Sequence, residues 1–154
     1  MSQCYVAGDF KKYFDENMGA LGLPVPSTMF DSYQTAIGTA STLVGTVATL
    51  GKGATVGELI GATVGLEKLA VAASLSAAAY TGAAIGSIAV ASGRSLSCGT
   101  SIADFLVFTR QTNLHFKGAE RFYARNPQVL DGSYPFRSSF GAKARKSPRL
   151  FEYA

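Results

Sequence analysis

One long block of this 154-residue chain, residues 32–93, is almost free of charge and is built from Ala, Gly, Ser and Thr with scattered Val, Leu and Ile. Two parts of it, 32–51 and 69–93, have no charged residue at all. As helices with a rise of 1.5 Å per residue they would be about 30 and about 37 Å long. A bilayer's hydrocarbon core is about 30 Å thick, so the pattern predicts two helices long enough to span it.

The segment between these two runs predicts a shorter helix from Ala54 to Leu66, after a break at Gly51-Lys-Gly53. Its four charges sum to zero and lie at Lys52, Glu58, Glu67 and Lys68. Ala, Gly, Ser and Thr contribute little to membrane insertion, and they outnumber Leu, Ile, Val and Phe in the block. We therefore expect helices that enter a bilayer conditionally.

The flanking segments have the apolar periodicity of amphipathic helices. Asp9 to Gly22 carries such a face before the Pro24-Val-Pro26 turn, and Thr100 to Arg125 predicts a second helix with a capped start at Thr100 to Asp104. From Asn126 onward, Pro and Gly among aromatic and basic residues predict an irregular tail. The prediction is one all-α domain, a small helical bundle with four parts: 1–31, 32–93, 94–125 and 126–154.

Glycines recur at helical spacing within the uncharged block. They form a doubled Gly-xxx-Gly and a second single copy, at Gly57, Gly61, Gly65, Gly82 and Gly86. Glycine inside a helix costs about 0.8 to 1 kcal/mol relative to alanine, so close packing is needed to compensate. These glycines are predicted to be helix-packing faces, in a membrane or within a bundle.

A stripe of threonines runs along the first uncharged segment. Spacings of 4, 3, 4 and 3 place five hydroxyls on one helix face, at Thr35, Thr39, Thr42, Thr46 and Thr49. Such hydroxyls can bond the carbonyl three or four residues back and still offer oxygens to an ion, so the stripe is a candidate pore lining. The alternative is a face packed against another helix or exposed to water.

Charge is distributed unevenly along the chain. Residues 1–31 have a net charge of −2, residues 32–93 of zero and residues 94–154 of +6, which together give the net +4 of the whole chain. A basic segment beside an apolar block indicates attraction to anionic headgroups or to an acidic partner. The run Lys143-Ala-Arg-Lys146 is commoner as a solvated tail than as a nucleic-acid site, and no nucleic acid is expected as a partner.

The two cysteines, Cys4 and Cys98, flank the uncharged block and are a candidate disulfide, although two separate buried thiols are the plainer interpretation. The first residues lack the basic and apolar regions of a Sec signal, so export by another machine is expected. The single histidine, His115, has no Cys or acid at a metal-ligand or triad spacing near it in sequence. No enzyme activity, cofactor or metal is expected.

The zipper glycines, the uncharged segments, the absent Sec signal and the small size resemble the glycine-zipper effectors of the bacterial type VI secretion system, and among them the pore-forming antibacterial cargo effectors. The resemblance implies loading into the hexameric tube protein Hcp, delivery from the producer's cytoplasm to the periplasm of a rival cell, and self-assembly in its inner membrane into ion-selective pores. Because hydroxyl and carbonyl oxygens carry partial negative charge and the uncharged segments contain no basic ring, we expect these pores to prefer small monovalent cations. It also implies a cognate immunity membrane protein in the producer.

Two alternatives belong to other classes of protein. One is a soluble all-α interaction module that packs a partner helix on its glycine faces. The other is a resident holin-like channel, which would fractionate with the producer's own membranes. Dye release from liposomes separates the first alternative from a pore-forming toxin.

Overall fold

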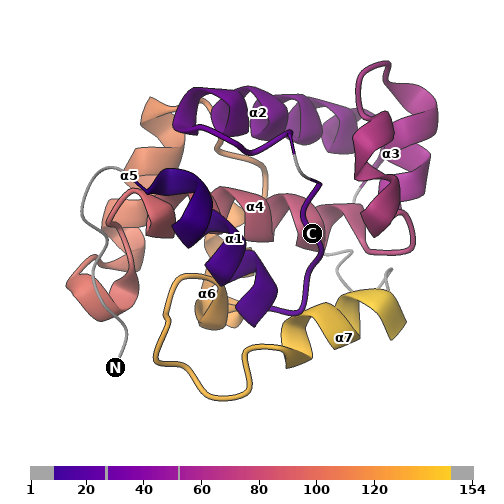
Figure 1. The fold of residues 1–154 in the computed structure, drawn as a ribbon. Helices are drawn as coiled ribbons and strands as arrows, with labels where there is room; N and C mark the ends of the chain where they lie inside the picture. The colour runs from indigo at the N-terminus through magenta and orange to yellow at the C-terminus, as the bar shows by residue number, and fades with distance from the viewer. Residues whose placement is uncertain (1–8, 27, 52, 147–154) are drawn as a thin grey trace.

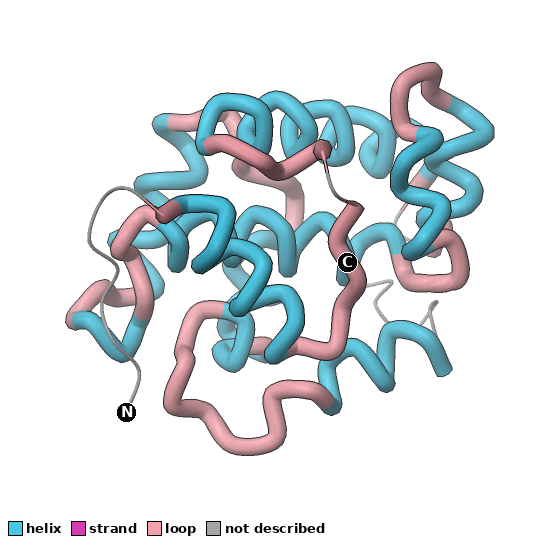
Figure 2. Tube along the Cα trace, viewed as in Figure 1, coloured by secondary structure: helices cyan, strands magenta, loops and turns pink. Residues whose placement is uncertain are grey.

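The computed structural model describes residues 9–26, 28–51 and 53–146, and every regular element in these ranges is a helix (Figures 1 and 2). The predicted all-α fold class is confirmed. In chain order the elements are α1 (Phe10–Ala20), α2 (Tyr33–Leu50), α3 (Val56–Ala62), the 3₁₀ helix η1 (Glu67–Ala72), α4 (Ala77–Ala91), η2 (Leu96–Cys98), α5 (Ile102–Gln111), α6 (Ala119–Arg125), η3 (Pro127–Val129) and α7 (Ser139–Lys146).

The first two helices have the expected bounds. α1 buries Phe14 and Met18 on its apolar face and is followed by Gly22, whose φ of +78° favours glycine. Ser32 caps α2 by accepting a hydrogen bond from the amide of Thr35, and Gly51 ends the helix at a φ of +100°. The local signals in the sequence were sufficient for both elements.

The segment from Ala54 to Ser76 differs from the prediction. α3 begins with a capping box between Thr55 and Glu58 and ends at Ala62, and η1 follows as a separate short helix. The backbone then returns along the start of α3, where the amide of Gly57 donates to the carbonyl of Ala73 at 2.9 Å. The predicted helix is therefore wrong beyond Ala62, and 69–93 is not one continuous helix.

The centre of the molecule is α4 (Figure 1). Its contacts with α1 and α2 are the most extensive between elements, and α3, α5, α6 and η3 also pack against it. In Figure 1, α2 runs above α4 and α1 crosses in front of it. Every residue of α4 from Ala77 to Ala89 is buried.

The amphipathic segment before Arg125 forms two helices instead of one. α5 has the expected start, a capping box between Ser101 and Asp104. The chain leaves the helix after Gln111 and takes positive φ values at Asn113 (+61°) and Gly118 (+89°) before α6 begins. This turn lets the aromatic residues of both helices face the same core, since the rings of Phe105 and Tyr123 lie 4.5 Å apart.

The tail is more regular than predicted, because apolar residues anchor it. Val129, Leu130, Phe140 and Ala144 are buried, and residues 139–146 form α7. Gly141 lets α7 approach the end of α1, and its amide donates to the carbonyl of Leu21 at 2.8 Å. The prediction of an irregular segment is wrong for these residues, while 147–154 lie outside the described ranges.

Candidate functional site

The central helix α4 contains no charged residue. It is surrounded by α1, α2, α3, α5, α6 and η3, which together form its cover. Ser76 caps its first turn by accepting from the amide of Ala79 at 3.2 Å. Tyr80 is fully buried, and its hydroxyl donates to the carbonyl of Pro24 at 2.9 Å. Burial raises the pKa of Tyr80 above its ordinary value of about 10, because the phenolate has no solvent there.

The second glycine pair lies on the buried surface of α4. A β-carbon on Gly82 would overlap the ring of Phe122, and one on Gly86 would overlap Val129. The hydroxyl of Tyr123 donates to the carbonyl of Gly82 at 2.7 Å. The two glycines therefore allow a close approach, and the neighbours are side chains of α6 and η3 within the same chain.

The first glycine triplet does not form one face. Gly57 lies against the backbone of Ala73, and a β-carbon added to Gly57 would lie 3.3 Å from the Ala73 carbonyl oxygen. Gly61 is exposed with open space around it, and Gly65 lies beyond the end of α3 at a φ of +100°. The expected spacing on a single helix fails at Gly65 because α3 has already ended.

The threonine stripe lies on α2, with Thr35, Thr42 and Thr49 exposed and Thr39 and Thr46 half-buried. Three hydroxyls bond the carbonyl four residues back, as expected for threonine in a helix. These bonds run from Thr42 to Gly38, from Thr46 to Thr42 and from Thr49 to Gly45, at 3.1, 2.8 and 3.1 Å. The stripe borders a shallow groove between α2 and α3.

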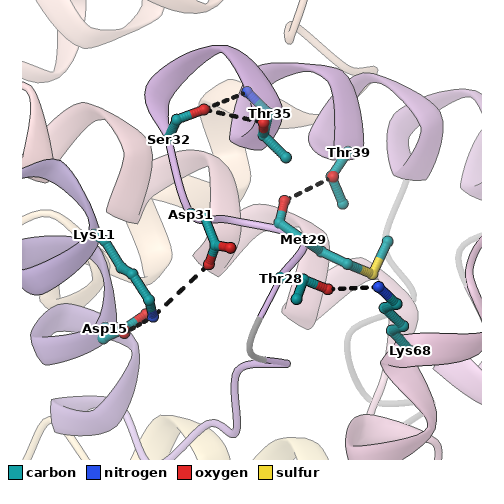
Figure 3. A network of polar contacts seen from close by, with 9 residues as sticks. All are labelled: Lys11, Asp15, Thr28, Met29, Asp31, Ser32, Thr35, Thr39 and Lys68. Atoms are coloured by element: carbon teal, nitrogen blue, oxygen red, sulfur yellow. Dashed lines mark hydrogen bonds and ion pairs between the residues drawn. The ribbon is translucent and has the colours of Figure 1, made fainter.

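Polar contacts fix the beginning of α2 (Figure 3). Thr39 donates to the carbonyl of Met29 at 2.8 Å, and the ammonium group of Lys68 donates to the hydroxyl of Thr28, also at 2.8 Å. Lys11 on α1 pairs with Asp15 at 2.7 Å, and the hydrogen bond to Asp15 raises the pKa of Lys11. The Lys11–Asp15 ion pair is exposed, so it contributes little to stability.

A buried polar network joins three distant parts of the chain. Asn17, only 5% exposed, donates to the hydroxyl of Ser87 at 2.9 Å and to the carbonyl of Val129 at 3.0 Å. Arg137 donates to the side-chain oxygen of Asn17 and to the carbonyl of Gln128. Burial lowers the pKa of Arg137, while the charge of Asp131 opposes that shift.

Sequence patterns did not reveal this network, although one signal was present. Asn17 lies three residues after Phe14 and four before Leu21, on the apolar face of α1. A lone amide on an apolar face requires buried partners. The partners at Ser87 and Arg137 are 70 and 120 residues away, so no local pattern identifies them.

An apolar cavity of about 250 Å³ separates part of α2 from α4. It is lined by Val44, Val47, Ala48, Gly51, Ala78, Thr81, Phe116 and Lys117. Thr81 is 4% exposed, and its hydroxyl has no hydrogen-bond partner among the described residues. A buried hydroxyl without a partner costs free energy, so the packing of α2 against α4 is imperfect at this point.

The structure brings two polar residues to His115 that sequence spacing did not indicate. Its Nδ1 lies 3.5 Å from the hydroxyl of Thr109, and its Nε2 lies 3.6 Å from a carboxylate oxygen of Glu120. The hydroxyl of Thr109 is buried and donates to the carbonyl of Leu106, so no substrate can reach it as a nucleophile. We assign no catalytic role to these residues.

The candidate disulfide lies partly outside the described ranges. Cys98 ends η2 and is disulfide-bonded, whereas Cys4 lies outside the residues that the structure describes. The pairing of Cys4 with Cys98 stays a prediction.

Within residues 9–26, 28–51 and 53–146, no helix is both long and apolar enough to cross a membrane. The same residues contain no cluster of three His, Cys, Asp or Glu side chains that could hold a metal ion.

Comparison with known proteins gave no match to a family model, a curated protein or a solved structure. The arrangement of α4 and its cover is therefore the basis for a functional proposal.

Proposed function

We propose that this chain is a pore-forming antibacterial toxin, and that its folded form conceals the helix that enters the membrane. One observation carries the proposal: α4 is uncharged and buried along nearly its whole length inside the other helices. A segment without charges is the kind that a bilayer accepts at low cost. A chain that hides such a segment can travel folded and insert when the cover opens.

Insertion requires more helix than the folded form contains. α4 has 15 residues and is about 22 Å long, shorter than a hydrocarbon core of about 30 Å. The uncharged sequence continues from Leu69 to Gly93, which spans about 37 Å if it is helical throughout. We expect residues 69–76, now η1 and a turn, to become helical in the membrane.

The second membrane helix in this proposal is α2. Its 18 uncharged residues would extend about 27 Å, and the connector from Gly51 to Lys68 has charges that sum to zero. The stripe from Thr35 to Thr49 would face the lumen, where its oxygens favour small monovalent cations. The exposure of several of these threonines on α2 is consistent with this role.

The delivery route follows from the resemblance to glycine-zipper effectors of the type VI secretion system. In this proposal the Hcp tube protein carries the folded chain from the producer's cytoplasm to the periplasm of the target cell. The chain then self-assembles in the inner membrane and dissipates the membrane potential, and an immunity membrane protein protects the producer.

The proposal is tested by dye release from vesicles of phosphatidylethanolamine and phosphatidylglycerol. A matched pair of variants places a charge at different depths. Ala84→Glu puts a carboxylate in the middle of α4, and Ala103→Glu puts one on the exposed surface of α5. We expect Ala103→Glu to release dye like the wild type. Ala84→Glu will also weaken the fold, so dye release by the wild type is the deciding result. If the wild type released no dye, the proposal would be refuted.

An interaction module remains the second candidate, because glycines on the exposed side of α2 have open space. β-carbons on Gly38 and Gly45 would meet nothing within 4 Å, so another helix could approach the backbone there. Such a module would bind a helical partner without releasing dye.

A further inference from the structure

The connection between α6 and α7 carries an exposed aromatic tip. Residues 133–136, Ser-Tyr-Pro-Phe, are all exposed. Phe136 is 86% exposed and Tyr134 41%. Two aromatic rings close together on a loop are a larger apolar feature than the single exposed side chains that are normal on protein surfaces.

The backbone holds Phe136 in a strained conformation. Its φ is +56°, which is uncommon for a bulky residue and marks a position that the surrounding structure enforces. The amide and hydroxyl of Ser139 both donate to the carbonyl of Phe136, at 3.1 and 2.8 Å. The next residue, Arg137, is fixed by its bonds to Asn17 and to the carbonyl of Gln128. The ring is therefore presented to solvent by an anchored loop.

The other end of the tip is fixed in the same way. The amide and hydroxyl of Ser133 both donate to one carboxylate oxygen of Asp131, at 2.9 and 2.7 Å. Asp131 is the only acidic residue among residues 126–146, which contain four basic residues: Arg137, Lys143, Arg145 and Lys146. The segment thus has a net charge of +3.

Basic residues follow the aromatic tip along the chain. Lys143 and Arg145 are exposed on α7, which begins three residues after Phe136. In Figure 1 the loop and α7 lie along the same lower edge of the molecule. Aromatic rings beside lysine and arginine are typical of surfaces at the headgroup level of a bilayer.

Two other exposed apolar side chains, Val64 and Val71, lack this combination. Val64 is 95% exposed and Val71 60%, and both lie in the segment between α3 and α4. The charges there, Glu67 and Lys68, cancel, and the segment from 63 to 73 has no aromatic residue. It serves as a matched control surface.

We propose that residues 133–136 and α7 form a docking surface for an anionic phospholipid bilayer, which this chain contacts before α4 is uncovered. The inference rests on the proposed function, because it supplies the first step of insertion. Electrostatic attraction brings the basic surface to the membrane, and the rings of Phe136 and Tyr134 enter the headgroup region. The loop adjoins Arg137, whose bond to Asn17 connects it to the buried network at α4.

The chain has no tryptophan, so a single introduced tryptophan reports on one position. Phe136→Trp places the reporter at the tip, and Val64→Trp places it at the control surface. Each variant is mixed rapidly with vesicles of phosphatidylethanolamine and phosphatidylglycerol that contain an entrapped dye. We expect the tryptophan emission of the Phe136→Trp variant to shift to shorter wavelength before dye release begins. The emission of the Val64→Trp variant should shift later or not at all, and vesicles of phosphatidylcholine alone should give no early shift.

The outcomes separate the docking surface from the proposed function. Dye release without an early shift at position 136, or with simultaneous shifts at both positions, would overturn the docking surface and leave the toxin proposal standing. An early shift at position 136 without dye release would support docking and count against pore formation. A shift that is equal on phosphatidylcholine would overturn the requirement for anionic lipid.

Vesicle flotation gives a second readout that does not depend on release. We expect Phe136→Ser to reduce binding about tenfold, because a largely exposed ring loses its transfer into the interface. Lys143→Gln with Arg145→Gln should weaken binding about tenfold or more and flatten its dependence on salt. Val64→Ser should bind like the wild type. Unchanged binding by both loop and α7 variants would refute the proposal.

Discussion

The side-chain amide of Asn17 on α1 donates a 2.9 Å hydrogen bond to the hydroxyl of Ser87, inside the buried helix α4. The same amide bonds Val129, and Arg137 bonds the Asn17 oxygen. One buried side chain therefore links the first helix, the central helix and the C-terminal segment. These polar contacts hold α1 and the C-terminal segment against α4.

Asn17→Leu should destabilise the fold by about 2 to 4 kcal/mol, because it leaves Ser87, the Val129 carbonyl and Arg137 without this partner. Urea unfolding followed by circular dichroism measures the effect. Gln34→Leu, on the exposed side of α2, is the control and should change stability little. Equal unfolding midpoints for the two variants would show that the network is not structurally important.

Alanine at two zipper glycines should have opposite effects. Gly86→Ala should cost about 1 to 3 kcal/mol, because the new methyl group overlaps Val129 in a packed core. Gly61→Ala meets nothing within 4 Å and should stabilise the fold by up to about 1 kcal/mol through helix propensity. Thermal unfolding measures both changes in stability. A change of the same sign at both positions would contradict the packing described for α4.

Gly61→Leu tests whether the first zipper has the proposed role in assembly. The position is open in the folded chain, so leucine should not destabilise the fold and, like alanine, should raise the unfolding midpoint slightly through helix propensity. If glycine is needed for close helix contact in the membrane, the variant should lose toxicity when it is directed to the periplasm. Full toxicity would mean that Gly61 is not part of an assembly face.

Thr81→Val should stabilise the folded form by about 1 kcal/mol, because it removes a buried hydroxyl that has no described partner. If the contact between α2 and α4 opens during insertion, the same variant should also slow dye release. Thr42→Val is the control, since its exposed hydroxyl donates to the carbonyl of Gly38 on the same helix. Destabilisation by Thr81→Val would reveal a partner for this hydroxyl.

Alkaline pH should destabilise the fold through Tyr80. Burial raises the pKa of its phenol in the folded state, so the stability it contributes is fully present below the unfolded pKa of about 10. That contribution is lost as pH rises above this value, because the unfolded chain releases the proton more readily. Tyr80→Phe should reduce the decline in unfolding free energy above a pH of about 10. An identical decline in the variant would contradict the assignment.

Local signals predicted much of the helical fold. Some helix ends are encoded within a few residues, by the caps at Ser32 and Ser101 and by the glycines at 22 and 51. The predicted helix ends at these positions therefore agree with the structure. The break between α5 and α6 was missed because apolar periodicity continues across it, while Asn113 and Gly118 reverse the chain. Tertiary packing therefore overrides the apolar periodicity that predicts one continuous helix here.

The candidate site was predictable only in part. The absence of charge in α4 is plain in the sequence, but its burial depends on contacts with α1, α6 and η3. Gly82 and Gly86 have the spacing of a helix-packing face, yet the side chains that fill the space belong to Phe122 and Val129. Spacing reveals that a surface can be approached closely, whereas the identity of the neighbour depends on the fold.

The most direct test of the central claim is conductance across a planar bilayer of phosphatidylethanolamine and phosphatidylglycerol after addition of purified protein. A potassium chloride gradient allows the reversal potential to be measured in the same experiment. We expect discrete conductance steps with a reversal potential that favours potassium over chloride, because α2 and α4 contribute hydroxyl and carbonyl oxygens and no basic side chain. No conductance at protein concentrations that saturate vesicle binding would contradict the account, and chloride selectivity would overturn the threonine lining.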